Sequence, residues 1–272
     1  MIPISEALHI ITRETTRLSI EKVEVANAAG RVLAEDVAAD MDMPPFDRSQ
    51  MDGYAVKAGD TANAPVKLKI VGESAAGRGW HNEMNAGEAV RIMTGAPVPT
   101  GADAVQKIEL TNETDGSVTI EKSVSVGQSI VNRGAEIGKG EMIFSAGTIV
   151  RENMIASLAA FGYPKVSVSK RPTVTVLPTG TEIVEIDEKP GTDQIRNSNA
   201  VMLKVFAEKY GSATTLPIAR DDISDLKEKI GVAVGESDIL VITGGVSVGK
   251  NDLTKPALRD LGAQIFFERL QL

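Results

Sequence analysis

The feature that most constrains the fold of this sequence is the alternation of short apolar stretches with longer amphipathic ones after Arg171. Strands that alternate with helices form βαβ units, in which the strands run parallel and the helices cover the sheet. This part of the sequence therefore predicts an α/β domain. We expect strands at residues 173–177, 213–218, 238–243 and 264–267, and helices at residues 200–210, 223–234 and 255–261.

The residues before this alternation have a different pattern. Residues 52–138 are rich in glycine and valine, and turn residues recur there at intervals of roughly 8–12 residues, which is typical of an all-β domain. Helices are expected from Ser5, with Leu8, Ile11 and Leu18 at helical spacing, and at residues 152–161, and short strands at residues 23–25 and 31–33. The chain is thus β-rich first and α/β second, with a boundary near residue 170.

Charge and composition exclude several classes of function. The formal net charge of −8 offers no basic surface for nucleic acid, and a chain without cysteine has no disulfide, cysteine nucleophile or thiolate metal site. No apolar run reaches the roughly 18 residues of a membrane span, and charged residues interrupt the first 17 residues, unlike a secretory leader. We therefore expect a cytoplasmic protein without nucleic-acid or membrane partners, and its two distant histidines predict no histidine metal site.

The chemistry of an open α/β sheet lies in the loops that leave the carboxyl ends of its strands. Here those loops are residues 178–182, 219–222 and 244–249, and each carries glycine or acidic residues. The third loop matches most of the phosphate-binding P-loop motif, but Asn251 stands where that motif needs a serine or threonine hydroxyl for Mg²⁺. We therefore reject a P-loop nucleotidase and favour an anion-binding turn. The three loops should lie side by side.

Five segments, taken together in order, resemble one family. They are residues 44–55 (PPFDRSQMDGYA), 91–105 (RIMTGAPVPTGADAV), 179–182 (TGTE), 194–199 (QIRNSN) and 243–249 (TGGVSVG) with Asp252. Each alone is moderately specific, but their order along the whole chain is very specific. The sequence is similar to the MoeA/gephyrin E-domain family of molybdenum insertases.

The resemblance implies a multidomain α+β and α/β fold. A β-rich domain at residues 39–139 would be inserted into a mixed dimerisation domain at residues 1–38 and 140–170, and a MogA-like parallel-sheet domain would follow at residues 171–272. It also implies a homodimeric transferase that places molybdate into adenylylated molybdopterin, uses Mg²⁺ and releases AMP. Molybdopterin adenylyltransferase and molybdoenzymes would be its protein partners.

The resemblance also implies catalytic roles for four carboxylates: Asp52, Glu182, Asp221 and Asp252. The last three leave separate strand ends, and because carboxylates repel a pyrophosphate, they would hold it through Mg²⁺. Turn statistics alone instead favour an Asx-turn for Asp52. Of Asp221 and Asp222, either could cap the following helix; we assign the cap to Asp222 and the site to Asp221.

Further positions are expected to bind substrate. Thr94 and Gly95 would form an oxyanion cradle for molybdate, and Ser198 and Asn199 would contact the pterin or nucleotide, although capping of the following helix is an equal alternative for these two. Asn197 and Glu136 stand where the family usually carries aspartate. The expected substrate-binding set is Thr94, Gly95, Glu136, Thr179, Gly180, Ser198, Asn199, Gly244, Gly245, Ser247 and Gly249.

The family continues beyond the segment equivalent to residues 265–272, with substrate-contacting lysines and the last elements of the α/β domain. We therefore expect this polypeptide to lack those elements and to be weakly active or inactive. Two alternatives remain open, a non-catalytic dimeric scaffold and a carrier that holds the pterin without turnover. Magnesium-dependent AMP release would distinguish the enzyme from both.

Overall fold

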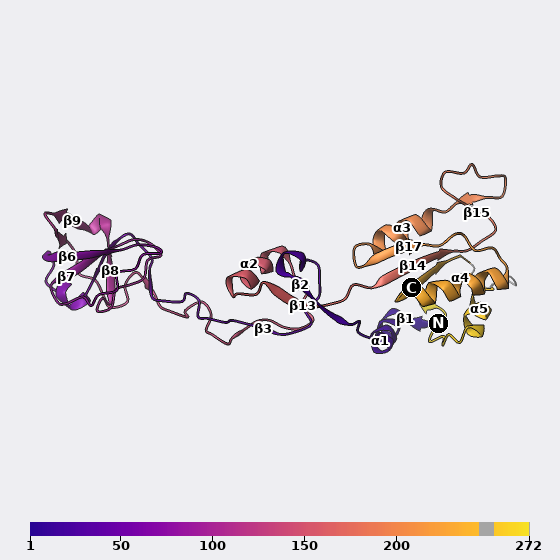
Figure 1. The fold of residues 1–272 in the computed structure, drawn as a ribbon, viewed down its shortest axis with the longest axis horizontal. Coiled ribbons are helices and arrows are strands. Elements are labelled where there is room, and N and C mark those ends of the chain that lie inside the picture. The colour runs from indigo at the N-terminus through magenta and orange to yellow at the C-terminus, as the bar shows by residue number, and fades with distance from the viewer. Residues whose placement is uncertain (245–252, 272) are drawn as a thin grey trace. The chain divides into compact units, whose positions relative to one another are not determined.

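The computed structural model describes residues 1–244 and 253–271, which belong to two compact units (Figure 1). The first, here called the α/β unit, comprises residues 1–34, 149–155 and 165–272. The second, here called the β unit, comprises residues 35–148 and 156–164. The expected division into three domains stays a prediction.

A three-stranded parallel sheet forms the centre of the α/β unit. Its order is β17 (Ser212–Thr215), β14 (Thr173–Pro178) and β18 (Ile239–Thr243). The central strand is buried from Val174 to Pro178, as expected for a strand with neighbours on both edges and helices on its faces. Figure 1 shows α3 (Ser198–Ala207) on one side of the sheet, and α4 (Ile223–Glu236) and α5 (Thr254–Asp260) on the other. The predicted parallel α/β sheet is confirmed.

One apolar cluster joins this sheet to α4 and α5. Leu177 of β14 packs with Leu226 and Ile230 of α4 and Ala257 of α5, and all four are buried. The spacing of Leu226, Ile230 and Ala233 places one face of α4 against the sheet, since residues four and seven apart share a helix face. This cluster fixes the start of α4 relative to the end of β14, where the candidate site lies.

Smaller elements complete the α/β unit. They are β1 (Ile2–Pro3), which pairs with β19 (Leu270–Gln271); α1 (Ile4–Glu14); β2 (Ile20–Glu24), which pairs with β13 (Lys165–Ser169); the 3₁₀ turn η1 (Val25–Asn27); and β15 (Ile183–Val184), which pairs with β16 (Ile195–Arg196). Helix α2 (Glu152–Ala160) has residues in both units.

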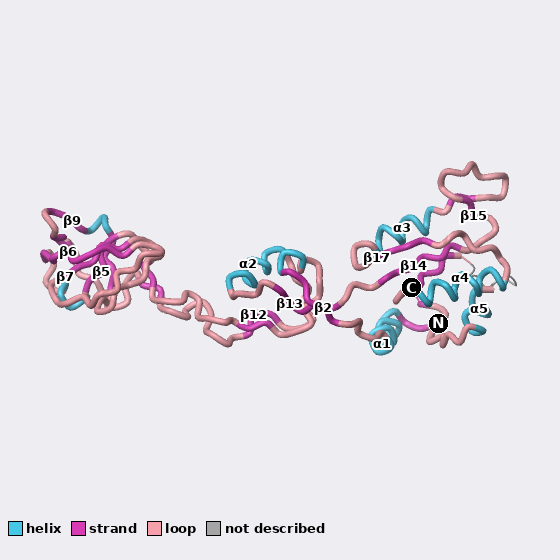
Figure 2. Tube along the Cα trace, viewed as in Figure 1, coloured by secondary structure: helices cyan, strands magenta, loops and turns pink. Residues whose placement is uncertain are grey.

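The β unit is built on a six-stranded sheet with the order β8-β5-β7-β6-β10-β9, visible as magenta segments in Figure 2. Tyr54 and Val56 pack into one cluster and Ala55 into another, because alternate residues of a strand face opposite sides of a sheet. The predicted β-rich region is confirmed. The strands are β5 (Gly53–Val56), β6 (Val66–Ser74), β7 (Glu88–Ile92), β8 (Ala104–Lys107), β9 (Thr111–Thr114) and β10 (Ser117–Ile120).

The remaining elements of the β unit are short. Two-residue β3 (Val37–Ala38) pairs with β12 (Met142–Phe144), and β4 (Arg48–Ser49) pairs with β11 (Ile130–Val131). The 3₁₀ turns are η2 (Ala58–Thr61) and η3 (Ile108–Leu110). No helix among the described residues is both long and apolar enough to cross a membrane.

Three sequence predictions about local structure were wrong. Helix α1 ends at Glu14 and Thr15 is extended, so Leu18 lies beyond it. Residues 264–267 are not a strand, and residues 31–33 make only isolated bridges, from Val32 to Ile149 and from Leu33 to Val168. Apolar β-formers favour an extended backbone, but a strand also requires a neighbour with which to form a ladder, and local sequence does not supply one.

Candidate functional site

The loop that follows β14 is held by both neighbouring strand ends. The backbone N–H and the hydroxyl of Thr179 donate to the carbonyl of Thr243 at 2.7 and 3.1 Å. The N–H of Gly180 donates to the carbonyl of Ala219 at 3.0 Å. The loops that carry Glu182 and Asp221 and the start of the third loop therefore lie side by side, as the topology of the sheet predicts.

Glycine is required in two of these loops for steric reasons. Gly244 has φ +87°, and a Cβ there would lie 2.1 Å from the carbonyl oxygen of Thr179. Gly180 has φ +139°, which L side chains rarely adopt. These glycines let the loops approach one another closely; that they also bind substrate stays a prediction.

A pocket of about 150 Å³ opens beside these loops. Four predicted site residues line it, although they come from three separate stretches of sequence: Glu182, Ser198, Asn199 and Gly244. Ligand pockets that enclose a whole small molecule measure roughly 300–1,000 Å³, so this one is large enough for part of a ligand. Its other lining residues are Ile183, Ile195, Arg196, Asn197 and Thr243.

Asp221 is bonded to the loop that carries Glu182. Its Oδ2 accepts hydrogen bonds from the N–H of Thr181 at 3.2 Å and from the Thr181 hydroxyl at 3.0 Å. Asp221 does not line the pocket, but it is fixed to the residue that precedes Glu182. The remaining predicted residues of this region, Gly245, Ser247, Gly249 and Asp252, lie outside the described residues.

The described residues supply only part of the expected metal site. Within residues 1–244 and 253–271, no group of three or more histidine, aspartate or glutamate side chains could hold a metal ion. Glu182 and Asp221 nevertheless provide carboxylate oxygens from adjacent loops. Mg²⁺ is commonly bound by one or two carboxylates with substrate oxygens and water, so this donor chemistry fits the ion.

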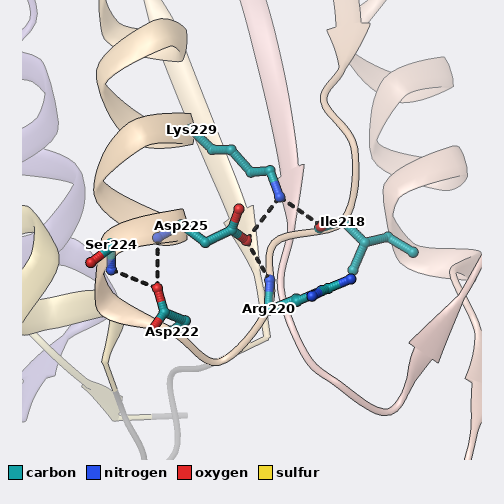
Figure 3. A network of polar contacts seen from close by, with 6 residues as sticks. All are labelled: Ile218, Arg220, Asp222, Ser224, Asp225 and Lys229. Atoms are coloured by element: carbon teal, nitrogen blue, oxygen red, sulfur yellow. Dashed lines mark hydrogen bonds and ion pairs between the residues drawn. The ribbon is translucent and has the colours of Figure 1, made fainter.

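A polar network missed by the sequence analysis fixes the loop that carries Asp221 (Figure 3). Lys229 of α4 donates to Asp225 Oδ2 at 2.8 Å and to the carbonyl of Ile218 at 2.9 Å. The N–H of Arg220 donates to the same Asp225 oxygen at 2.7 Å. The signal was present in the sequence, since an acid four residues before a lysine forms a pair on a helix.

Asp222 is the N-cap of α4, as predicted. Its Oδ1 accepts hydrogen bonds from the N–H groups of Ser224 and Asp225, both at 2.9 Å (Figure 3). These backbone donors would otherwise lack partners in the first turn of the helix. The cap and the Asp225 network together anchor both sides of Asp221.

Asp225 is expected to make the stability of the α/β unit depend on pH. The Lys229 side chain, followed by the Arg220 N–H, lowers the pKa of the Asp225 carboxyl below its usual 3.8. Its stabilising contribution is therefore present at neutral pH and is lost as pH falls through this lowered pKa. We expect Asp225→Asn to reduce the free energy of unfolding at pH 7 by about 1 kcal/mol. The difference from wild type should shrink below pH 3.8, as measured by urea unfolding with circular dichroism. A difference that persisted unchanged in acid would contradict this.

The N-cap of α3 was not anticipated. Ser198 and Asn199 are the first residues of the helix, and Asn197 is its cap, because Asn197 Oδ1 accepts from the N–H of Ala200 at 3.3 Å. The alternative that Ser198 or Asn199 caps the helix is therefore wrong. Asparagine is as good a cap as aspartate, so the residue in which this sequence differs from the family suits the position structurally.

In the β unit, Asp52 is held by a residue distant in sequence. Asp52 Oδ1 accepts from the N–H of Thr94 at 2.7 Å and from the Thr94 hydroxyl at 2.8 Å. These two bonds lower the pKa of the Asp52 carboxyl, and the side chain is exposed. The carboxylate is therefore bonded across the fold rather than to its own turn, which contradicts the Asx-turn alternative.

The proposed oxyanion cradle is already occupied by protein acceptors. The Thr94 donors bind Asp52, and the N–H of Gly95 donates to the carbonyl of Ser49 at 2.8 Å. An oxyanion such as molybdate would have to displace the Asp52 carboxylate to reach Thr94. Binding of substrate by Thr94 and Gly95 stays a prediction.

Glu136 lies in an ion pair on the same unit. Its Oε1 accepts from Arg48 at 3.0 Å, and more than half of its side chain is exposed. Nearby in sequence, Arg133 bonds Asp42 at 2.6 Å, and Asp42 also accepts from the N–H of Lys139. These pairs neutralise both acids, and substrate binding by Glu136 stays a prediction.

Comparison with known proteins gives a consistent result. Residues 2–162 match the family model "MoeA N-terminal region (domain I and II)", and residues 175–272 match "Probable molybdopterin binding domain". A molybdopterin molybdenumtransferase of Bacillus subtilis is 38% identical over 283 residues, which covers 100% of this chain and 65% of that protein. Its counterpart in Staphylococcus epidermidis is 33% identical, covering 99% and 65%. The chain thus spans less than two thirds of the length of these relatives.

A solved structure supports the same assignment. The molybdopterin biosynthesis MoeA protein from Pyrococcus horikosii superposes with a TM-score of 0.84 at 34% identity. The match covers 96% of this chain and 67% of that one.

Proposed function

This chain belongs to the MoeA family, and we propose that it acts as a molybdenum insertase, transferring molybdate into adenylylated molybdopterin with release of AMP. One observation carries the proposal: residues from three separate segments line one pocket where the parallel strands end. Relatives that match the whole chain are molybdopterin molybdenumtransferases, which supports the same reaction.

Different residues of the α/β unit would bind different groups of the substrate. The first turn of α3, with Ser198 and Asn199, presents a partial positive charge to the pocket, which suits an anionic group. Glu182 faces the same pocket and can accept hydrogen bonds from a hydroxyl or amino group of the ligand. Asp221, bonded to Thr181, supplies a second carboxylate on the loop next to that of Glu182.

The carboxylate oxygens of this site are ligands that suit Mg²⁺. Glu182 and Asp221 would hold it, together with Asp252, which lies outside the described residues. When bound, the ion would offset the repulsion between the phosphoanhydride and the two carboxylates and would polarise the phosphoanhydride.

Asp52 supplies a carboxylate from the β unit. Because the two Thr94 hydrogen bonds lower its pKa, Asp52 is ionised at neutral pH and can accept a proton from a reacting group. We also propose that the chain works in the cytoplasm as a homodimer, and that it receives substrate from a molybdopterin adenylyltransferase and passes product to molybdoenzymes.

AMP release by the purified chain tests the proposed function. We expect AMP to form from adenylylated molybdopterin only when molybdate and Mg²⁺ are both present, as followed by chromatography in a single-turnover reaction. Stoichiometric retention of the pterin without AMP release would support a carrier instead. The absence of both pterin binding and AMP release would support a scaffold.

A further inference from the structure

Ser49 carries a fully buried hydroxyl three residues before Asp52. It ends β4 and is 0% exposed, whereas Gln50, Met51 and Asp52 are all exposed. Its Oγ donates to the carbonyl of Met51 at 2.6 Å and accepts from the N–H of Met51 at 3.2 Å. A serine hydroxyl has one donor hydrogen and two acceptor lone pairs, so it can bond both groups at once. The backbone of the residue that precedes Asp52 is therefore bonded to one buried side chain.

The backbone of Ser49 is bonded to the segment that carries Thr94. The N–H of Ser49 donates to the carbonyl of Ala96 at 3.0 Å, and the N–H of Gly95 donates to the carbonyl of Ser49 at 2.8 Å. On its other side, β4 pairs with β11. Ser49 is therefore held from two directions, and the loop that follows it has a fixed starting point.

This loop contacts the Thr94 segment a second time, at Asp52. The carboxylate of Asp52 accepts from the N–H and from the hydroxyl of Thr94. Between the two contacts, the loop consists of Gln50 and Met51 alone. Because the Ser49 hydroxyl bonds both backbone groups of Met51, it fixes the short link between the two contacts.

Backbone hydrogen bonds hold the residues on either side of Met51. The N–H of Gln50 donates to the carbonyl of Ser129 at 2.9 Å, and the N–H of Ile108 donates to the carbonyl of Asp52 at 3.0 Å. Loss of the hydroxyl should therefore leave the loop folded and change its conformation only locally. Since Met51 is exposed, water can then bond its N–H and carbonyl.

From these contacts we propose that Ser49 is a positioning residue, whose hydroxyl fixes the backbone of Met51 and thereby holds the Asp52 carboxylate beside the donors of Thr94. The inference rests on the proposed function, since Asp52 is the proton acceptor assigned there. A displacement of about 1 Å in a reacting group can slow a reaction up to about a hundredfold. The fixed loop should therefore contribute to the rate of reaction rather than to the binding of substrate.

Ser49→Ala removes the hydroxyl and tests this role. We expect amide hydrogen exchange at Thr94 to become up to about tenfold faster, because its N–H donates to a carboxylate that is no longer held in place. The rate of single-turnover AMP release should fall about tenfold, with little change in the substrate concentration that gives half the maximal rate. Ser49→Cys fills the same space with a group that hydrogen-bonds weakly, so it should change exchange and rate in the same direction.

Thr61→Val is a matched control, since Thr61 carries another fully buried hydroxyl of the β unit. Its Oγ1 donates to the carbonyl of Ala58 at 2.8 Å and accepts from the N–H of Val124 at 3.0 Å, and neither bond involves the loop that follows β4. Valine keeps the shape of threonine without the hydroxyl. We expect Thr61→Val to lower the midpoint of urea unfolding, as Ser49→Ala does, but to leave Thr94 exchange and AMP release unchanged.

Wild-type exchange at Thr94 in Ser49→Ala would overturn the positioning role, as would equal changes in Ser49→Ala and Thr61→Val. An unchanged rate of AMP release despite faster exchange would also overturn it. Circular dichroism checks that each variant folds, and Ser49→Cys carries the same test if Ser49→Ala does not. The proposed function fails separately. If wild type releases no AMP from adenylylated molybdopterin, the insertase assignment is lost, while exchange at Thr94 still decides whether Ser49 holds Asp52 in place.

Discussion

Asp52→Asn is expected to slow molybdate-dependent AMP release by about 10²–10⁴-fold, the range for removal of a general acid or base. Asparagine keeps an oxygen that can accept from the N–H and hydroxyl of Thr94, so the loop should stay in place. The substitution removes the negative charge and the ability to accept a proton. The loss should therefore appear in the rate of the chemical step in single-turnover assays, with little change in stability.

The pH dependence gives a second check on Asp52. Its pKa lies below 3.8, because the hydrogen bonds from Thr94 favour the charged form. Activity that depends on this carboxylate should stay constant on lowering the pH through the neutral range and fall only as its pKa is approached. An acid limb near neutral pH that disappears in Asp52→Asn would contradict the proposed ionisation.

Asp115→Asn is a matched control for the loss of charge. Asp115 lies in the exposed turn between β9 and β10 of the same unit and has φ 45°, a conformation that asparagine tolerates. This variant should retain full AMP release. Equal losses in both variants would show that charge on the unit, rather than the Asp52 carboxylate, governs the rate.

Gly53→Ala should destabilise the β unit strongly. A Cβ on Gly53 would lie 1.9 Å from the carbonyl oxygen of Gln106, on the paired strand β8. Both residues are buried and the contact involves backbone, so the two strands must move apart. We expect the free energy of unfolding to fall by about 3 kcal/mol, at the upper end for an overpacked core.

Fluorescence of Trp80 reports this loss specifically. It is the only tryptophan of the chain, and it packs against a core cluster of the β unit. Gly59→Ala is the matched control, since no atom lies within 4 Å of a Cβ there and its φ is not in the left-handed region. The urea concentration at the midpoint of unfolding should fall markedly for Gly53→Ala and change little for Gly59→Ala. A similar small shift for both would contradict the close approach of the strands.

Gly53 illustrates what local patterns miss. The Asp-Gly pair next to a strand suggests a glycine needed for unusual backbone geometry. Gly53, however, does not have a positive φ. It is required because a strand about fifty residues away, β8, passes within contact distance of its Cα. That requirement depends on the pairing of β5 with β8, which no short stretch of sequence specifies.

Part of the candidate site was anticipated from position in the sheet, whereas Ser198 and Asn199 were anticipated only from the family resemblance. Glu182 and Gly244 end or follow parallel strands, so topology alone brings their loops together. Asn197 was not anticipated as the N-cap of α3, because three neighbouring residues that can cap a helix stand at its start and only the fold decides which one does. Lys229 and Asp225 have a recognisable helical spacing, but their contact with the loop of Asp221 depends on how α4 packs.

The sequence by itself determined the order of the elements and the class of each region, because periodicity and residue preference act over a few neighbouring residues. The five segments that resemble the family can likewise be recognised from the order of residues along the chain. Only the tertiary structure decided which extended segments became strands, which carboxylates were bonded to distant residues, and which residues lined a pocket. Those outcomes depend on contacts between residues far apart in the chain, and their energies exist only once the chain has folded.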